Sequence, residues 1–439
     1  MRGHKINMED TTISNLGECK YKSPLNLNVK PEKEADFGFV SESEKVRFLH
    51  EVDISRPPVP ELLFEKAGPR EKIFFDPAKI RAAIVTCGGL CPGLNNVIRS
   101  AFLCLQHEYG VKEVFGIRYG YQGLNPAIGE APILLDADMV DRIHQTGGTI
   151  LGSSRGDQPI PVMVDFLVKN NINMLLTVGG DGTQRGAQQI AEEVKKRGLS
   201  IAVVGIPKTI DNDIMYVKRS FGYTTAADKA HDVLTCAHTE AKSYPNGIGL
   251  VKLMGRDSGF IAAGATIASQ DVNFTIIPEI PLVLEGEKGF LETLKRRILN
   301  RKHAVIAVAE GAGQALLSGI KVKDASGNVL HSDIGLFLRD KIVAYFKEQK
   351  IPVNMKYIDP SYIIRSVEAN SEDSFLCDQY ARSAVHAAMA GKTGMIIGLW
   401  NGFIHLPIAL ATNQRQYINP NGFQWNCVIS STGQPLRWG

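Results

Sequence analysis

Several features that often decide a protein's class are missing from this sequence. Its 49 basic and 46 acidic residues nearly cancel to a formal charge of +3, so no charge excess predicts a nucleic-acid partner. The seven cysteines are odd in number and scattered, and Cys87 and Cys91 lack the spacing of a redox pair or zinc knuckle. This favours a reducing compartment. The longest apolar run (395–411) is broken by polar residues and a proline, which predicts a buried strand and turn rather than a membrane span.

Targeting signals and simple catalytic signatures are also missing. The first residues, MRGHKINMEDTTIS, carry acidic side chains early and have no apolar core. We find no internal repeat, low-complexity tract, HExxH motif or nucleophile elbow. The 44% apolar content is enough for full cores, and 439 residues allow two or three domains. We therefore expect a cytoplasmic globular protein with no membrane partner.

Alternating strand-like and helix-like segments dominate the chain from residue 79 onward. Apolar runs rich in β-branched residues end in glycine turns and are followed by segments of helical periodicity. This alternation predicts parallel strands with crossover helices, in a doubly wound α/β sheet and a second α/β lobe. We expect strands at 79–87, 111–117, 171–178, 201–205, 247–254, 303–309 and 395–400, and helices at 94–110, 183–198, 256–270 and 332–350. Residues 1–78 are polar and are interrupted by prolines. They predict an extension that is wrapped on the rest of the protein or is partly mobile.

The glycine-rich motif Gly179-Gly180-Asp181-Gly182-Thr183 falls between a predicted strand and a predicted helix. Its backbone N–H groups could cradle a phosphate, whose charge the helix dipole would favour. Asp181 would then supply a hard oxygen to a divalent ion that bridges phosphates. A tight turn with the aspartate as helix cap is the alternative, and the motif alone leaves both open. The doublet Gly88-Gly89 after the first strand is a weaker signal of the same kind.

Polar side chains crowd into PKTIDND (207–213), directly after another predicted strand. If this segment is extended, Thr209, Asp211 and Asp213 point the same way, into the crevice beyond the carboxyl ends of the strands. One carboxylate could take a proton from a substrate hydroxyl while the other holds the substrate or a metal. Lys208 is expected to meet a phosphate or to balance the aspartates. The alternative is an Asx-rich turn that caps a helix.

Four cations would complement this acidic crevice: Arg155, Arg256, Lys356 and Arg365. Arg256 ends a predicted strand and opens a helix of small residues, which places its guanidinium at a helix N-terminus. In PSYIIRS (360–366) the proline suits a first helical turn, and Tyr362 and Arg365 at i and i+3 would share a face. The set predicts a phosphate clamp, and ordinary surface ion pairs are the alternative.

Taken in order, these motifs closely resemble those of the phosphofructokinase family: GGLCPGLN, GGTILGSSR, GGDGT, PKTIDND, MGRDSG, AEG and YIIR. The resemblance covers roughly residues 79–400, and so many motifs in one order are highly specific. Lys208 and the PSYIIR segment look most like the plant and trypanosomatid ATP-using branch. AGPREKIFFDP (67–77) is similar to the plant enzymes in particular.

The resemblance implies an α/β fold of two doubly wound Rossmann-like lobes, with the active site in the cleft between them. It implies Mg²⁺-dependent transfer of a phosphoryl group from ATP to the 1-hydroxyl of fructose 6-phosphate, and a homo-oligomer, with a tetramer favoured. The implied domains are an N-terminal extension (1–78), a nucleotide-binding lobe (79–222), a sugar-phosphate-binding lobe (223–380) and a C-terminal segment packing back on the lobes (381–439).

The resemblance also assigns residues to roles. Asp211 would be the general base, with Arg155, Lys208 and Arg256 as further catalytic residues. The nucleotide side would comprise Gly88, Tyr121, Arg155, Gly180, Asp181, Gly182 and Thr183, with Asp181 as the magnesium-linked carboxylate. The sugar side would comprise Thr209, Ile210, Asp211, Asp213, Met254, Gly255, Arg256, Glu310, Lys356, Tyr362 and Arg365. Bacterial members have an arginine where Gly247 stands and a histidine where Tyr362 stands, so the clamp for the 6-phosphate must differ.

Donor choice depends on two positions. Pyrophosphate-using relatives carry aspartate where Gly182 stands and lysine where Lys208 stands, so this sequence has one of each. Glycine leaves room for the rest of a nucleotide, whereas a carboxylate would add negative charge near the α-phosphate, and we therefore expect ATP. A pyrophosphate-dependent phosphofructokinase is the first alternative. A non-catalytic sugar-phosphate-binding subunit is the second, and the intact Asp181, Asp211 and Asp213 argue against it.

Overall fold

The computed structural model describes residues 8–27, 38–49, 51, 55, 62–317 and 332–439, and the chain divides into two compact units. Unit 1 comprises Met1–Thr209, Ile214–Phe221 and Glu368–Arg415, and unit 2 comprises Ile210–Asp213, Gly222–Val367 and Gln416–Gly439. No helix within the described ranges is long and apolar enough to cross a membrane. The lobe boundary expected at residue 380 lies inside α10 (Ser371–Met389), and the expected domain ranges stay a prediction.

Unit 1 is built on a nine-stranded sheet in the order β3-β4-β17-β16-β10-β9-β6-β7-β8. The five strands from β16 to β7 run parallel, and the outer strands run antiparallel. All residues of β9 and β10 are buried, as expected for strands covered on both faces. The strands are β3 (Lys45–Arg47), β4 (Leu63–Lys66), β6 (Arg81–Thr86), β7 (Glu113–Ile117), β8 (Ile133–Leu134), β9 (Met174–Gly179), β10 (Ala202–Pro207), β16 (Met395–Leu399) and β17 (Phe403–Pro407).

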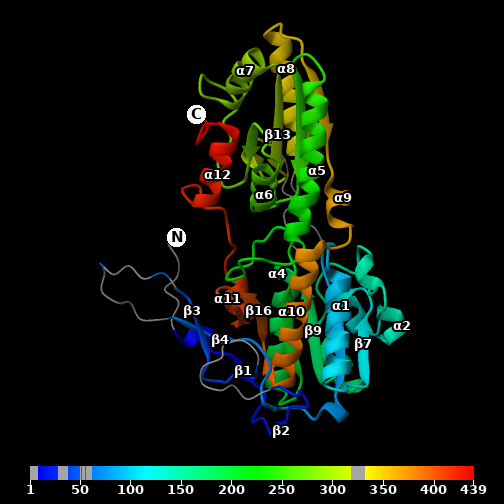
Figure 1. Cartoon of the computed structure of the whole chain (residues 1–439). Helices are drawn as coiled ribbons and strands as arrows, with labels where there is room; N and C mark the ends of the chain where they lie inside the picture. The colour runs from blue at the N-terminus through cyan, green and yellow to red at the C-terminus, as the bar shows by residue number, and fades with distance from the viewer. Residues whose placement is uncertain (1–7, 28–37, 50, 52–54, 56–61, 318–331) are drawn as a thin grey trace. The chain divides into compact units, whose positions relative to one another are not determined.

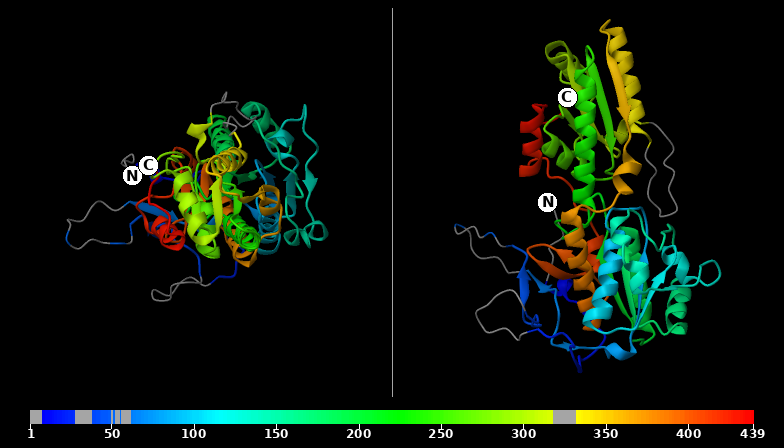
Figure 2. Two further views of the ribbon diagram at one scale, coloured as in Figure 1. Left: turned by 90° about the horizontal axis from the view of Figure 1, so that it is seen from above. Right: turned by 45° about the vertical axis from the view of Figure 1, so that its right-hand side comes forward.

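Helices of unit 1 pack in two groups. α1 stands beside α10 in front of the strands, and α3 and α11 pack against α4 (Figure 1, Figure 2). The helices are α1 (Leu94–Leu103), α2 (Ala137–Val140), α3 (Ile160–Lys169), α4 (Asp181–Lys196), α10 and α11 (Ile408–Thr412). The short 3-10 turns are η1 (Met8–Thr11), η2 (Pro77–Lys79), η4 (Gly120–Leu124) and η5 (Ile143–Gln145). Two small antiparallel strand pairs are formed by β1 (Ser14–Asn15) with β15 (Lys392–Thr393) and by β2 (Tyr21–Lys22) with β5 (Lys72–Ile73).

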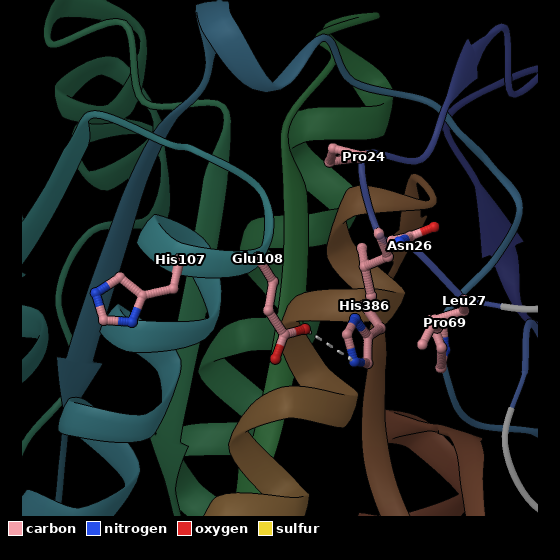
Figure 3. A pocket seen from close by; sticks show the side chains of 8 residues that line it. Pro24, Asn26, Leu27, Pro69, His107, Glu108 and His386 are labelled. Atoms are coloured by element: carbon pink, nitrogen blue, oxygen red, sulfur yellow. Dashed lines mark ion pairs between the residues drawn. The ribbon is translucent and has the colours of Figure 1, made fainter.

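The helix expected at 94–110 is shorter and changes type. α1 ends at Leu103, and the chain continues as a π-helical turn, η3 (Cys104–Glu108). Glu108 at the end of this turn faces His386 of α10 (Figure 3). The helical periodicity of the sequence predicted the segment but not the widened turn.

The order of the parallel strands brings two glycine turns together. β6 pairs with β7 on one side and with β9 on the other, and β10 lies beyond β9. The connection that leaves β6 therefore leads toward β7, and the connection that leaves β9 leads in the opposite direction, toward β10. In doubly wound sheets this reversal opens a ligand-binding edge at the carboxyl ends of the strands. Gly88 follows β6 and Gly180 follows β9 at that edge.

Unit 2 has a smaller, wholly parallel sheet in the order β12-β13-β11-β14. α5 packs against α6 and against β11, β13 and β14, while α7 packs against β13 and α8 packs against β11 and β14. The elements are α5 (Tyr223–Lys242), β11 (Gly247–Leu253), α6 (Phe260–Ser269), β12 (Phe274–Ile276), α7 (Phe290–Arg301), β13 (His303–Ala309), η6 (Gln314–Leu316), α8 (Ile334–Glu348), β14 (Asn354–Ile358), α9 (Ser361–Arg365) and α12 (Phe423–Thr432). The predicted fold class, two doubly wound α/β sheets, is confirmed.

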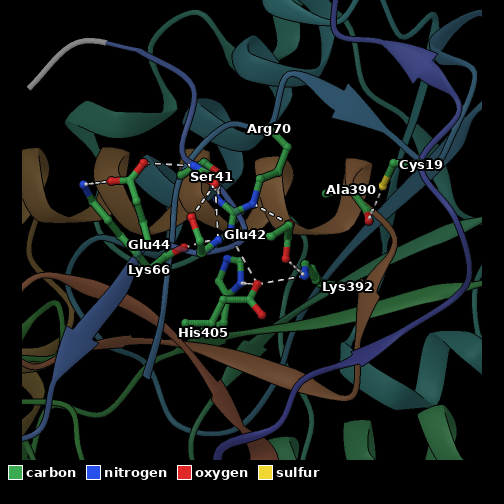
Figure 4. Close-up of polar contacts among 12 residues, drawn as sticks. Cys19, Ser41, Glu42, Glu44, Lys66, Arg70, Ala390, Lys392 and His405 are labelled. Atoms are coloured by element: carbon green, nitrogen blue, oxygen red, sulfur yellow. Dashed lines mark hydrogen bonds and ion pairs between the residues drawn. The ribbon is translucent and has the colours of Figure 1, made fainter. Parts of the chain in front are cut away.

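The described part of the N-terminal extension adds strands to unit 1, which its irregular sequence did not predict. β3 and β4 continue the sheet beyond β17. Glu65 of β4 accepts hydrogen bonds from His405 Nδ1 at 2.8 Å and from Lys392 Nζ at 2.9 Å. Figure 4 labels both of these donors together with Arg70 and Glu42. Arg70 Nη2 lies 3.2 Å from the same carboxylate, and Glu42 accepts from Arg70 and Lys392 at 2.8 Å each. This buried ion cluster attaches β4 to β15 and β17.

Glu65→Gln should lower the free energy of unfolding by about 3–5 kcal/mol, because it leaves buried cations without their counter-charge. Burial alone would raise the pKa of Glu65. Hydrogen bonds from His405 and Lys392 outweigh burial and hold this pKa well below its usual 4.5. A lowered pKa contributes stability that is present above pH 4.5 and is lost as the pH falls. The wild type should therefore lose more stability than the variant as the pH falls from about 4.5 to about 3, measured by urea unfolding.

Glu44→Gln is the matched control, because Glu44 makes a more exposed ion pair with Lys66 at 3.0 Å. Such a pair contributes about 0–1 kcal/mol. Equal losses in the two variants would contradict the role given to the Glu65 cluster.

Candidate functional site

The first group of candidate residues lies at the carboxyl edge of the unit 1 sheet. Gly88 has a left-handed φ of 84°, and its N–H donates to the Ser154 carbonyl at 3.1 Å. Lys208, which follows β10, is buried and donates from Nζ to the Gly89 carbonyl at 2.6 Å. Arg155 Nη2 lies 3.5 Å from where a Cβ on Gly89 would stand. The structure thus brings both predicted cations to the Gly88-Gly89 turn.

The start of α4 carries the second glycine turn. Gly180 is the N-cap and Asp181 is the first helical residue, so the alternative in which Asp181 caps the helix is wrong. A Cβ at Gly182 would meet nothing within 4 Å, which leaves open space beside the first turn. Asp181 Oδ2 accepts from Arg415 Nε at 3.1 Å and lies 3.9 Å from Arg185 Nη1. The turn therefore combines helix N–H groups, a carboxylate and cations in one place.

Tyr121 and Thr183 are buried beside this turn. The Tyr121 hydroxyl donates to the Thr183 carbonyl at 2.6 Å, and both residues are buried. A Cβ on Gly186 would stand 2.6 Å from the Tyr121 ring, and one on Gly179 would stand 2.2 Å from the Thr183 hydroxyl. Both residues, which were predicted for the nucleotide side, therefore support the backbone at the start of α4.

The PKTIDND segment is not extended, contrary to the prediction. Ile210–Asp211 form a turn, and Asn212 has a left-handed φ of 54°, which asparagine tolerates better than most residues. The alternation argument for Thr209, Asp211 and Asp213 is therefore wrong. Thr209 belongs to unit 1, whereas Asp211 and Asp213 belong to unit 2. The Ile210 side chain is buried, so only its backbone is available to a ligand.

Asp211 is the most perturbed carboxyl group among the candidates. Its Oδ2 accepts the N–H of Arg256 at 3.3 Å, and its carbonyl accepts from Ser258 Oγ at 2.9 Å. Burial first, and then the charges of Asp213 and Glu310, raise the pKa of Asp211 from 3.8 to about 7, against the lowering effect of Arg256. Such a carboxyl group can exchange a proton near neutral pH.

Close backbone approaches hold the loop after β11 against the loop after β13. The Gly311 N–H donates to the Gly255 carbonyl at 3.0 Å. A Cβ on Gly311 would stand 1.7 Å from the Arg256 carbonyl oxygen. Gly255 has φ 129°, and a Cβ there would stand 2.5 Å from the Ser258 carbonyl oxygen. The glycines of MGR and AEG therefore place Arg256 and Glu310 beside Asp211.

Sequence reasoning missed two residues near the C-terminus. Arg415 binds Asp181 across 234 positions of sequence within unit 1. In unit 2, the Gln416 N–H donates to the Asp213 carbonyl at 2.8 Å, and its Nε2 donates to the Asn212 carbonyl at 3.1 Å. TNQRQY (412–417) has no glycine turn or family motif that marks these roles.

Lys252 was also missed, and it organises the start of α9. Its Nζ lies 2.7 Å from Asp333 Oδ2 and 2.8 Å from Asp359 Oδ2. Asp359 in turn accepts from the N–H and hydroxyl of Ser361 at 3.2 and 2.5 Å. As predicted, Tyr362 and Arg365 share a face of α9, with the guanidinium carbon 4.6 Å from the ring centroid. Lys252 thereby fixes the segment that presents them.

The structure does not bring Lys356 to the Asp211 group. Lys356 Nζ lies 3.6 Å from Glu240 Oε1 and 5.4 Å from the centre of the Tyr244 ring. Glu240 is at the C-terminal end of α5 and Tyr244 follows it in the connection to β11, at the amino edge of the sheet. Gly247 begins β11, and a Cβ there would stand 2.0 Å from the Ala241 carbonyl oxygen, so no side chain fits at that position.

Comparison with known proteins identifies the class and then the family. The fold is similar to the pyrophosphate-dependent phosphofructokinase from Marinobacter aquaeolei (TM-score 0.66, 19% identity, 82% of this chain and 92% of that chain). It is also similar to Pichia pastoris phosphofructokinase in the T-state (TM-score 0.63, 21% identity, 81% and 37%). These similarities define the class as proteins of the phosphofructokinase fold.

The sequence relatives are nearer. An ATP-dependent 6-phosphofructokinase from Borreliella burgdorferi is 52% identical over 97% of each chain. The ATP-dependent 6-phosphofructokinase 7 from Arabidopsis thaliana is 48% identical over 86% of this chain and 78% of its own length. The profile of the family described as phosphofructokinase matches residues 81–388. The chain belongs to the phosphofructokinase family.

Gly255→Ala should destabilise the protein by about 1–3 kcal/mol and disturb the loop that places Arg256, because an alanine is strained at this φ. Gly182→Ala is the matched control. Its Cβ meets nothing, and alanine favours a helix, so urea unfolding should show stability equal to or slightly above the wild type. A Gly255→Ala protein as stable as the control would show that the close approach at Ser258 is not a constraint.

Proposed function

We propose that the chain is an ATP-dependent 6-phosphofructokinase, which transfers the γ-phosphoryl group of ATP to the 1-hydroxyl of fructose 6-phosphate and gives fructose 1,6-bisphosphate and ADP. The observation that carries this proposal is the Asp211 carboxyl group, whose pKa is raised to about 7, beside Arg256 in a member of the phosphofructokinase family. Relatives named ATP-dependent 6-phosphofructokinase at 43–52% identity support ATP as the donor.

The residues of unit 1 suit the nucleotide. The N–H groups at the start of α4 favour phosphate oxygens, and the open space at Gly182 supports a donor larger than pyrophosphate. Lys208 and Arg155 supply positive charge at the other glycine turn. They would reduce repulsion between phosphates and hold them in place.

Asp181 fits the Mg²⁺ that the family implies. Mg²⁺ is commonly bound through one or two carboxylates together with substrate phosphates and water. Asp181 provides one hard oxygen ligand at a helix N-terminus, and it is not part of a cluster of three potential ligands among the described residues. Bound there with the nucleotide, Mg²⁺ would neutralise charge on the phosphate oxygens. Arg415 and Arg185 lie near Oδ2 of Asp181 and orient the carboxylate.

The residues of unit 2 suit the sugar. Asp211 takes the proton of the 1-hydroxyl as that oxygen bonds to the γ-phosphorus and the bond from this phosphorus to the bridging oxygen of ADP breaks. Arg256 offsets the charge that develops on the transferred group. Asp213 and Glu310 hold sugar hydroxyls and keep the pKa of Asp211 raised. Tyr362 and Arg365, on one face of α9, are the proposed contacts of the 6-phosphate.

We further propose a cytoplasmic homo-oligomer, with a tetramer favoured. All seven cysteines are free thiols, which supports a reducing compartment. Large apolar side chains are unusually exposed on α9, α10 and α12, including Tyr362 at 74%, Phe375 at 67% and Phe423 at 86%. Exposed apolar surface of this kind is typical of protein contacts.

Donor choice is tested by incubating the purified protein with fructose 6-phosphate, Mg²⁺ and either ATP or pyrophosphate. We expect turnover with ATP, and turnover with pyrophosphate alone would overturn the donor assignment. Gly182→Asp should lower kcat/KM for ATP at least about tenfold, because a like charge beside phosphates costs more than about 1.4 kcal/mol. Gly182→Ala, which adds a Cβ without charge, should keep ATP activity.

Asp211→Asn should lower kcat by about 10² to 10⁴ with little change in sugar binding, which is the usual range for a positioned general base. In the wild type, kcat/KM should fall about tenfold per pH unit below about pH 7, because the base becomes protonated there. Steady-state kinetics across pH measures both effects.

Asp232→Asn is the control, since Asp232 is an exposed carboxylate of α5 paired with Lys229 at 3.2 Å. It should keep the wild-type rate and pH profile. If Asp211→Asn also kept near-normal turnover, Asp211 would not be the base.

A further inference from the structure

Three side chains outside the candidate functional site converge where η3 meets α10. Cys104 and Glu108 begin and end η3, and His386 lies near the C-terminal end of α10. One ligand atom from each lies within 4.8 Å of the other two. Cys104 and His386 are buried, and Glu108 is partly exposed. In the described part of the chain, no other trio of histidine, cysteine or acidic residues is arranged in this way.

The spacing of these atoms suits a metal as well as the hydrogen bond that the Cys104 thiol donates to Glu108. Cys104 Sγ lies 3.6 Å and His386 Nε2 lies 3.9 Å from Glu108 Oε2. The latter is too long for a hydrogen bond, although the two groups face one another (Figure 3). Bonds of about 2.3 Å from zinc to sulfur and about 2.0–2.2 Å to nitrogen and oxygen place tetrahedral neighbours about 3.3–3.7 Å apart. The two distances to Glu108 Oε2 need to shorten by about half an ångström or less, and Cys104 Sγ and the His386 ligand atom lie within 4.8 Å of each other.

The outer partners also match those of a metal site. Tyr109 Oη lies 2.8 Å from His386 Nδ1, so Nε2 is the ring nitrogen that faces Glu108. Metal-binding histidines usually engage their second nitrogen in this way. Arg382 bonds Glu108 Oε1 and leaves Oε2 for the cluster, and Asp378 holds Arg382 at 2.7 Å.

A cavity of about 400 Å³ gives access to the cluster. Glu108 and His386 line it together with Pro24, Asn26 and Pro69 (Figure 3). It can supply a water molecule as a fourth ligand, the arrangement found where zinc has three protein ligands.

We propose that Cys104, Glu108 and His386 form a Zn²⁺ site whose fourth position opens to this cavity. A thiolate and an imidazole favour Zn²⁺ over Mg²⁺, so the site is distinct from the one proposed at Asp181. On binding, the Cys104 thiol loses its proton to solvent and a sulfur–metal bond forms. The metal then joins η3 to α10 and stabilises unit 1 by mass action.

The test uses full-length, tag-free, chelator-treated protein and Co²⁺ as a spectroscopic substitute for Zn²⁺. The wild type should bind one Co²⁺ per chain with a sulfur-to-cobalt charge-transfer band, and Zn²⁺ should remove the band and raise Tm. Absence of the band in the wild type would overturn the proposal, and this result does not depend on any variant folding.

Variants then assign the ligands. Cys104→Ser should abolish the band, whereas Cys236→Ser, which changes an exposed cysteine of α5, should retain it. The reverse pattern would overturn the proposal. Tyr109→Phe should keep the band and weaken Co²⁺ affinity about 10–100-fold, because it removes only the outer partner of His386. Unchanged affinity in Tyr109→Phe would count against the geometry proposed here.

Discussion

The proposed chemistry depends on keeping one carboxyl group, that of Asp211, away from water and close to other negative charges. Each of these conditions disfavours its ionised form, and the backbone N–H and the charge of Arg256 offset them only in part. An ordinary aspartate is too weak a base at neutral pH to remove a proton from an alcohol efficiently. The surrounding of Asp211 raises its pKa, and the loops after β11 and β13 contribute to this surrounding.

Close backbone contact creates this surrounding. Parallel strands end at one edge of their sheet, so the loops after β11 and β13 necessarily lie near each other. Gly255 and Gly311 let them approach within hydrogen-bond distance, where any side chain would collide with backbone atoms. In unit 1, a Cβ on Gly179 would stand 2.2 Å from the Thr183 hydroxyl, and Gly88 has a left-handed φ of 84°. Glycine is therefore required by space at Gly179 and Gly311, by conformation at Gly88, and by both at Gly255.

Most of the fold was predictable from the sequence, because buried parallel strands are continuous apolar runs and the glycine turns mark their ends. The site was predictable only where its residues lie within a motif. The PKTIDND segment was misjudged because alternation assumes an extended chain, and Asn212 turns it instead. Arg415 and Lys252 were missed because their partners are remote in sequence, and strands β3 and β4 because they are short and held by a buried ion cluster.

The pKa of Asp211, raised to about 7 in the folded protein, is the property on which the proposed general base depends. It can be measured directly as the difference infrared spectrum between wild type and Asp211→Asn, with ¹³C-labelled aspartate, over a pH titration without substrates. We predict a protonated-carboxyl band, absent from the variant, that disappears with a midpoint near pH 7. A midpoint near 3.8, the ordinary value for aspartate, would contradict the account.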